Sequence, residues 1–92
     1  MNPLPLPAHV HYELLLQLLE QQSMAVMQEM TLDPTIDPVR AGQLRSAREY
    51  LHTTLVMIRK ALVAQKQLEE ICAVQGIPVS YRWSLNEIPE ML

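Results

Sequence analysis

The sequence has few of the residues that build disulfides, glycine-rich loops or an aromatic core. Its 92 residues include two glycines, no phenylalanine and a single cysteine, Cys72. One cysteine cannot form an intrachain disulfide, and two glycines cannot build a phosphate-binding loop such as GxGxxG. We therefore expect no cofactor, and we interpret Cys72 as a core residue in a reducing compartment.

Long apolar runs and a targeting signal are also missing. No apolar run approaches the roughly 18 residues of a membrane span, and residues 1–7 lack the basic start and apolar stretch of a secretory signal. Seven Lys and Arg against ten Asp and Glu give a net charge of −3, which disfavours a nucleic-acid surface. We expect a cytoplasmic protein that does not bind membranes and whose partner is a protein.

What the sequence does contain is the pattern of two long helices in a single domain, residues 1–92. Residues 8–31 lack Gly and Pro and repeat apolar residues at steps of three and four, which predicts a helix. A second helix is predicted over residues 38–75. Asp37 and Pro38 form its start signal, and Gly76 followed by Pro78 forms its end.

The two ends of the chain differ from this helical pattern. Alternating prolines in residues 1–7 predict a polyproline arm that acts as a simple leader. Residues 77–92 form a docking tail, in which Ile77, Val79, Tyr81 and Trp83 alternate with polar residues as in an extended segment. A short terminal helix, capped by Ser84 or Asn86, follows. One lone strand is unstable, so the tail must dock on the helices or on another chain.

Each predicted helix has more apolar faces than one partner helix can cover. In the first helix, the combined apolar arc spans about 220°, against about 100° for an ordinary surface helix. Its main stripe comprises Tyr12, Leu15, Leu16, Leu19, Val26, Met27 and Met30, and a neighbouring strip comprises Leu14, Leu18, Ala25 and Leu32. The second helix carries one seam of Leu44, Ala47, Leu51, Leu55, Ile58 and Leu62, and a second seam of Tyr50, Met57, Ala61, Ala64, Leu68 and Ile71.

These faces predict an all-α fold, a long antiparallel helical hairpin that dimerises into a four-helix bundle. Burying one Leu or Met stabilises a protein by about 1.5–3 kcal/mol, so exposing four to six of them would offset a small domain's stability. The alternative is a self-contained monomer in which the tail folds back over one seam.

Few residues suggest chemistry. His9, His11 and Glu13 form the one cluster with a metal-like composition, but further ligands are not evident, and we interpret these residues as solvated. His52 has no candidate nucleophile nearby and is interpreted as a surface residue. We therefore expect neither a metal site nor enzyme activity.

The resulting functional prediction is a non-enzymatic interaction module, such as a small helical adaptor, a co-chaperone or an inhibitory binder. It would bury its apolar seams against a second copy of itself or a client helix. The predicted partner-binding residues are Leu14, Leu18, Met24, Ala25, Tyr50, Met57, Ala61, Ala64, Leu68, Ile71, Tyr81 and Trp83. The alternative is a dimeric regulator that contacts nucleic acid through Arg40, Arg45 and Arg48.

Overall fold

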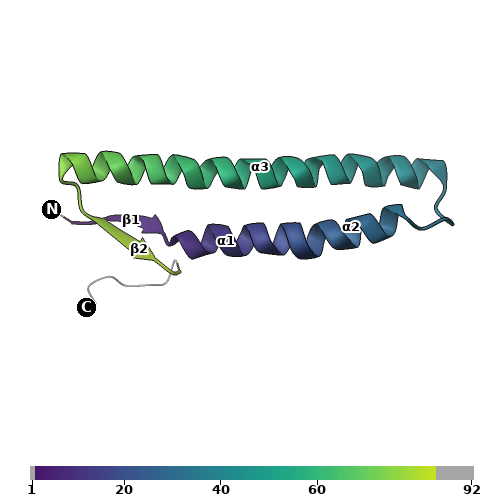
Figure 1. The fold of residues 1–92 in the computed structure, drawn as a ribbon, viewed down its shortest axis with the longest axis horizontal. Helices are drawn as coiled ribbons and strands as arrows, with labels where there is room; N and C mark the ends of the chain where they lie inside the picture. The colour runs from purple at the N-terminus through teal and green to yellow at the C-terminus, as the bar shows by residue number, and fades with distance from the viewer. Residues whose placement is uncertain (1, 85–92) are drawn as a thin grey trace.

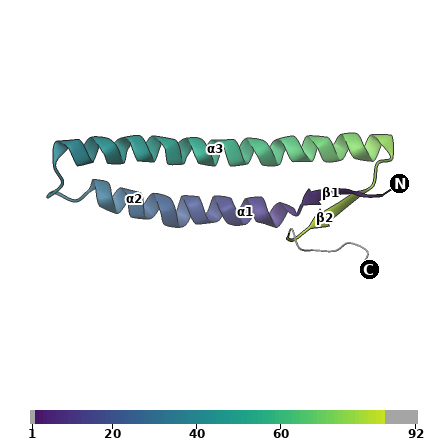
Figure 2. The same cartoon turned by 180° about the vertical axis from the view of Figure 1, so that it is seen from behind.

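The computed structural model describes residues 2–84 as an extended, mostly helical molecule with principal extents of 60 × 27 × 17 Å (Figure 1). Its elements, in order, are β1 (Leu4–Pro7), α1 (His9–Gln17), the π-helical segment η1 (Leu18–Ser23), α2 (Met24–Thr31), α3 (Pro38–Gln75) and β2 (Val79–Arg82). We call the unbroken run of α1, η1 and α2 the first helical stretch. From end to end, the first helical stretch lies alongside the longer α3 (Figures 1 and 2).

The ends of α3 agree with the predicted signals. The Asp37 carboxylate accepts a hydrogen bond from the Arg40 backbone N–H at 2.7 Å, as an N-cap should. Gly76 has a φ of 71°, and the Ile77 N–H donates to the Cys72 carbonyl at 2.8 Å. The 38-residue helix therefore begins and ends where local chemistry places its boundaries.

The connector between the helices is also stabilised locally. Asp33 Oδ1 accepts hydrogen bonds from the Thr35 hydroxyl at 2.7 Å and from the Thr35 N–H at 2.9 Å. The side-chain hydrogen bond, followed by the backbone one, lowers the pKa of the Asp33 carboxyl from its ordinary value. Such a turn is typical of Asp, whose short side chain bonds the backbone two residues further on.

The first helical stretch differs from the prediction because of η1. A π-helical turn contains more residues than an α-helical turn, so the residues after η1 are rotated relative to those before it. As a result, Val26 and Met30, which were expected in the core, are exposed, whereas Met27 is half-buried. Before η1, Tyr12, Leu16 and Leu19 are half-buried as expected, but Leu15 is exposed at the edge of the contact. The expectation of one uniform apolar stripe along this helix is wrong.

The face of α3 that packs on the first helical stretch follows steps of three and four. Its inward positions are Leu44, Leu51, Leu55, Ile58, Leu62, Gln65, Glu69 and Cys72, all buried or half-buried. The predicted first seam forms most of this face, but Ala47 is exposed and was wrongly included. The buried apolar residues of the described chain are Ala8, Leu44, Leu55 and Cys72, so the core of one copy is narrow.

The proline-rich arm is not a free leader. Residues 4–7 form β1, which pairs in parallel with β2 in the register Leu4 to Val79 and Pro7 to Arg82. The N–H groups of Leu4 and Ala8 donate to carbonyls of the tail at 2.8 and 3.1 Å. Pro5 and Pro7 occupy the alternate positions, whose backbone nitrogens face away from β2. Proline is tolerated there because a strand edge needs no donor on its outer side.

The tail docks on its own chain, which answers a question that the sequence leaves open. β2 pairs with β1 beside the end of α3, so the extended segment expected after Gly76 is present as a strand (Figure 1). The predicted terminal helix with its Ser84 or Asn86 cap extends beyond the described residues. Among the described residues, no helix has the length and hydropathy that crossing a membrane would require.

The two glycines of the chain should respond to alanine with opposite signs. Gly76→Ala places a side chain at positive φ and should lower the free energy of unfolding by about 1–2 kcal/mol. Gly42→Ala lies inside α3, where the new Cβ would be 3.8 Å from Arg45, and should raise it by up to about 1 kcal/mol. Urea denaturation at matched protein concentration measures both. Equal effects of the two variants would contradict the assigned cap.

Candidate functional site

A cluster of hydrogen-bonded side chains joins the strand pair to the helices. The Gln65 side chain, whose residue is 6% exposed, donates to the Pro7 carbonyl at 2.8 Å and to Glu69 Oε2 at 2.9 Å. It also accepts from the Tyr12 hydroxyl at 2.6 Å. This buried amide therefore connects β1, α1 and α3, and its hydrogen bonds offset the cost of burying it.

His9 belongs to the same cluster. Its Nε2 atom lies 2.7 Å from Glu69 Oε2, and its ring meets the Tyr81 ring edge-on at a centroid distance of 5.5 Å. His11 makes a similar edge contact with Trp83 at 5.8 Å. Both histidines therefore pack against other parts of the chain, and interpreting them as solvated residues was wrong. Within residues 2–84, no group of three or more His, Cys, Asp or Glu residues is arranged to hold a metal ion.

The cluster shifts the titration of two of its members. Burial raises the pKa of the Glu69 carboxyl, but hydrogen bonds from His9, Gln65 and Tyr81 outweigh burial and lower that pKa below its ordinary value of 4.5. The hydrogen bond to the same carboxylate raises the pKa of the Tyr81 hydroxyl. Cys72, one turn further along α3, is 2% exposed, so its thiol is closed to solutes. The geometry of this cluster is that of a structural junction.

A residue of the helix pair can be assigned to one of two sides by whether it directly precedes or directly follows an inward residue in the sequence. On the first helical stretch, the half-buried inward positions include Leu16, Leu19, Ser23, Met27 and Thr31. Glu20 follows an inward position there, and Arg59 follows one on α3; the two form an ion pair. Residues that follow inward positions therefore share one side of the molecule. Residues that precede inward positions share the opposite side.

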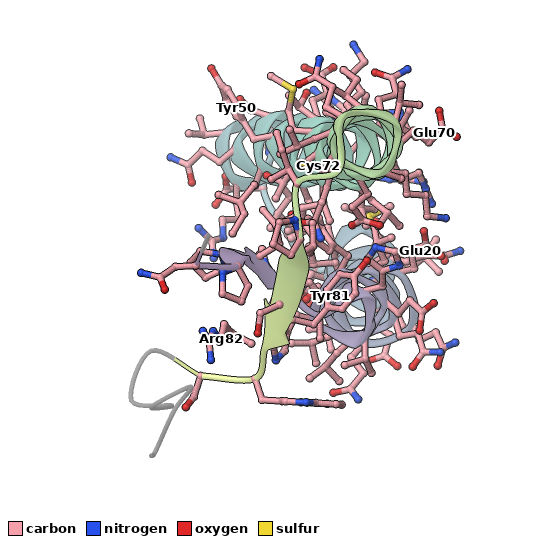
Figure 3. All side chains as sticks on the ribbon, turned by 90° about the vertical axis from the view of Figure 1, so that its left-hand side faces the viewer. Glu20, Tyr50, Glu70, Cys72, Tyr81 and Arg82 are labelled. Atoms are coloured by element: carbon pink, nitrogen blue, oxygen red, sulfur yellow. The ribbon has the colours of Figure 1, made fainter. Side chains whose placement is uncertain are left out.

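The side chains on these two sides differ in charge. We call the first side the charged face. It includes Glu13, Glu20, Arg45, His52, Arg59, Lys66 and Glu70, with Val63 among them. We call the second side the uncharged face. It comprises Leu15, Leu18, Gln22, Val26, Met30, Gln43, Tyr50, Thr54, Met57, Ala61, Ala64, Leu68 and Ile71. Viewed along the long axis, Tyr50 lies on one side of α3, while Glu70 and Glu20 lie on the other (Figure 3).

The apolar side chains of the uncharged face are open to solvent within the described chain. Tyr50 is 73% and Met57 60% exposed, and on the first helical stretch Val26 is 50% and Leu18 45% exposed. The strand pair lies at one end of the molecule (Figures 1 and 2), and the exposed fractions show that it does not cover these positions. The alternative in which the tail covers Met57, Ala64 and Leu68 is therefore wrong for the described residues.

The first helical stretch also has a shallow cavity of about 360 Å³ on this side. Its lining residues are Leu18, Gln22, Ser23, Val26, Met27 and Met30, none of which is charged. The cavity spans η1 and most of α2. Sequence reasoning did not find it, because its position depends on the rotation that η1 introduces.

The structure brings most predicted partner-binding residues together. Seven of them lie on the uncharged face: Leu18, Tyr50, Met57, Ala61, Ala64, Leu68 and Ile71. Leu14 is exposed beside Leu15, at the margin of this face. Tyr81 and Trp83 lie in and just after β2, at the end of the molecule.

Two predicted residues fall elsewhere. Met24 is half-buried and directly follows the inward Ser23, so it lies toward the charged face. Ala25 is exposed and lies away from the uncharged face because the apolar strip shifts at η1. The strip that begins with Leu14 and Leu18 continues through Val26 rather than Ala25. The sequence signal that could have revealed this shift is the unusually wide apolar arc of the first helix. A single straight α-helix rarely has so wide an arc, whereas a shift partway along the helix spreads its apolar positions over a wider one.

The three arginines of the alternative nucleic-acid hypothesis lie near the start of α3. All are exposed, and Arg40 Nη1 donates to Gln43 Oε1 at 3.3 Å. Arg45 lies on the charged face. Binding of nucleic acid through these residues stays a prediction.

The sequence matches one protein family and is similar to a protein of a cyanobacterium. Residues 1–84 match the model of a family of unknown function, DUF5340. An uncharacterized 9.3 kDa protein in the soluble hydrogenase 5′ region of Anabaena cylindrica is 42% identical over 87 residues, which cover 94% of this chain and 88% of that protein. No solved structure matches the chain.

The Glu69 cluster predicts a loss of stability in acid. Because the pKa of Glu69 is lower in the folded chain than in the unfolded one, its contribution is complete above about pH 4.5 and is lost as the pH falls through the folded-state pKa. Thermal unfolding followed by circular dichroism from pH 7 to pH 3 should show a smaller decrease for Glu69→Gln than for the natural chain. Glu49→Gln, an exposed acid on the same helix, serves as the control. An unchanged slope in Glu69→Gln would contradict the assignment.

Proposed function

We propose that this chain, which belongs to the family of unknown function DUF5340, is a non-enzymatic protein–protein interaction module that pairs with a second copy of itself through the uncharged face. In this proposal the first helical stretch and α3 form an antiparallel helical hairpin. Two such hairpins would pack face to face as a four-helix bundle. The lone, buried Cys72 is compatible with a reducing compartment, so we place the protein in the cytoplasm.

The observation that carries the proposal is the gathering of exposed apolar side chains from both helical stretches on one side without a charged residue. Helices of a monomer normally turn polar residues to solvent, as the charged face does here. Covering a Leu or Met stabilises a protein by about 1.5–3 kcal/mol. Burying several of the exposed residues of this face would therefore contribute as much as a small domain's whole stability.

The narrow core of one copy supports the same conclusion. Small domains bury a limited share of their surface, and this one has four buried apolar residues among those described. Pairing would turn the uncharged face into a second core. The spacing of Met57, Ala61, Ala64, Leu68 and Ile71, with alternate steps of four and three, is typical of helices that pack against another helix.

The size of the face is sufficient for a stable dimer. The uncharged face runs from Gln43 to Ile71 along α3, about 42 Å at 1.5 Å per residue. On a molecule whose middle extent is 27 Å, a face of that length is of the order of the roughly 800 Å² that each partner contributes to a standard interface. A client helix of another protein is the competing occupant. We favour a second copy because an uncharged apolar face complements itself, whereas nothing on it selects a particular client by charge.

A matched pair of lysine substitutions tests the proposal. Met57 and Val63 lie on the same helix and are 60% and 54% exposed, but Met57 belongs to the uncharged face and Val63 to the charged face. Met57→Lys should weaken self-association at least tenfold, about 1.4 kcal/mol, because it places a charge in the interface. Val63→Lys should leave association unchanged. Light scattering coupled to size exclusion measures the mass over a range of concentrations.

Two results would count against self-association. The natural chain could remain a folded monomer at high concentration without binding an apolar dye, or both lysine variants could weaken the dimer equally. The first result would leave the exposed face without a role, and the second would show that the interface lies elsewhere.

A further inference from the structure

We propose that Tyr50 of each copy fills the cavity beside η1 of its partner, with the two-fold axis of the dimer parallel to the long axis of the molecule. This inference rests on the proposed self-association and assigns its geometry. It follows from three features: the height of Tyr50 along the helices, the side on which the cavity opens and the charges of the two helical stretches.

The contacts between the helical stretches fix the height of Tyr50. His9 meets Glu69, Tyr12 meets Gln65 and Glu20 meets Arg59, so the residue numbers in each pair add up to between 77 and 79. Because the numbers of two facing residues add up to 77–79, Tyr50 lies level with residues 27–29 of its own chain. That height falls within the span of the cavity, which extends from Leu18 to Met30.

Two arrangements allow two uncharged faces to meet with two-fold symmetry. In the first arrangement, the two-fold axis lies in the plane of the interface and is perpendicular to the helices. It stacks the first helical stretch on the partner's first helical stretch, and α3 on the partner's α3. An axis parallel to the helices keeps every residue at its own height and stacks the first helical stretch on the partner's α3. Only the parallel axis places Tyr50 opposite the partner's cavity at a matching height.

Charge favours the parallel axis. Residues 1–37 contain five acidic residues and no Lys or Arg, whereas residues 38–76 contain six Lys and Arg and three acidic residues. The parallel axis places the acidic stretch of one copy against the basic α3 of the other, and the perpendicular axis pairs like with like.

The cavity has the chemistry that a tyrosine side chain needs. Leu18, Val26, Met27 and Met30 provide apolar walls, and methionine side chains adapt readily to an aromatic ring. Gln22 and Ser23 provide polar groups for the phenolic hydroxyl, which usually requires a partner when buried. Tyr50 is the most exposed large side chain on the α3 part of the uncharged face, as expected of a residue that inserts into a partner.

Cross-linking between two single-cysteine variants tests the axis. In a Cys72→Ala background, Thr54→Cys and Gln22→Cys leave Tyr50 and the apolar residues intact. Thr54 lies level with residues 23–25 by the relation above, so it should lie between Gln22 and Val26 of the partner, within reach of a cysteine at position 22. When differently tagged variants are refolded together and treated with a short bismaleimide, the Thr54→Cys to Gln22→Cys heterodimer should dominate. Val63→Cys on the charged face should not cross-link to either variant.

Substitution of Tyr50 itself tests the occupant of the cavity. Tyr50→Ala should raise the dimer dissociation constant at least about tenfold, as expected of a central aromatic residue, and Tyr50→Phe should raise it less. Circular dichroism verifies that each variant folds.

Each outcome decides a separate point. Predominant cross-linking of Thr54→Cys with itself would overturn the parallel axis while leaving self-association intact. A Tyr50→Ala variant that dimerises normally would overturn the occupancy of the cavity. A natural chain that is monomeric would overturn both this inference and the proposed function.

Discussion

The line of contact between α3 and the first helical stretch determines the rest of this structure. It runs through Leu44, Leu55 and Cys72 in steps of three and four residues. Once these positions face inward, every other residue of both stretches is assigned to one side or the other. The ion pair of Glu20 and Arg59 lies on one side, and Tyr50 and Met57 lie on the other. The division between a charged and an uncharged face is thus a direct consequence of packing.

The polar junction at the end of the helices solves a different problem. Two strands of four residues each are too short to be stable alone. Gln65 and Glu69, which occupy inward positions where leucine would suffice, instead bind β1, α1 and β2 through hydrogen bonds. The helix pair therefore supports the strands, and the strands cover the end of the helix pair.

Local signals predicted the helices well because helix ends depend on nearby residues. Asp37, Pro38 and Gly76 act within one turn of the boundaries that they define. The strand pair could not be predicted in the same way, because its partners are some 75 positions apart and proline at every second residue resembles a polyproline arm. Gln65, Glu69 and His9 were missed for a related reason: polar side chains in a helical repeat look solvated until their partners are known. The α3 part of the uncharged face was predictable from spacing, whereas η1 displaced the other half.

The parallel pairing of β1 and β2 has a mechanical consequence. In the register Leu4 to Val79 and Pro7 to Arg82, the chain enters β1 at one end of the pair and leaves β2 at the other. A force that pulls the two ends of the polypeptide apart would therefore act along the strands and load their hydrogen bonds together in shear, rather than opening them one at a time. The helices, joined behind this small ladder, would be shielded from tension until the ladder ruptured as a unit.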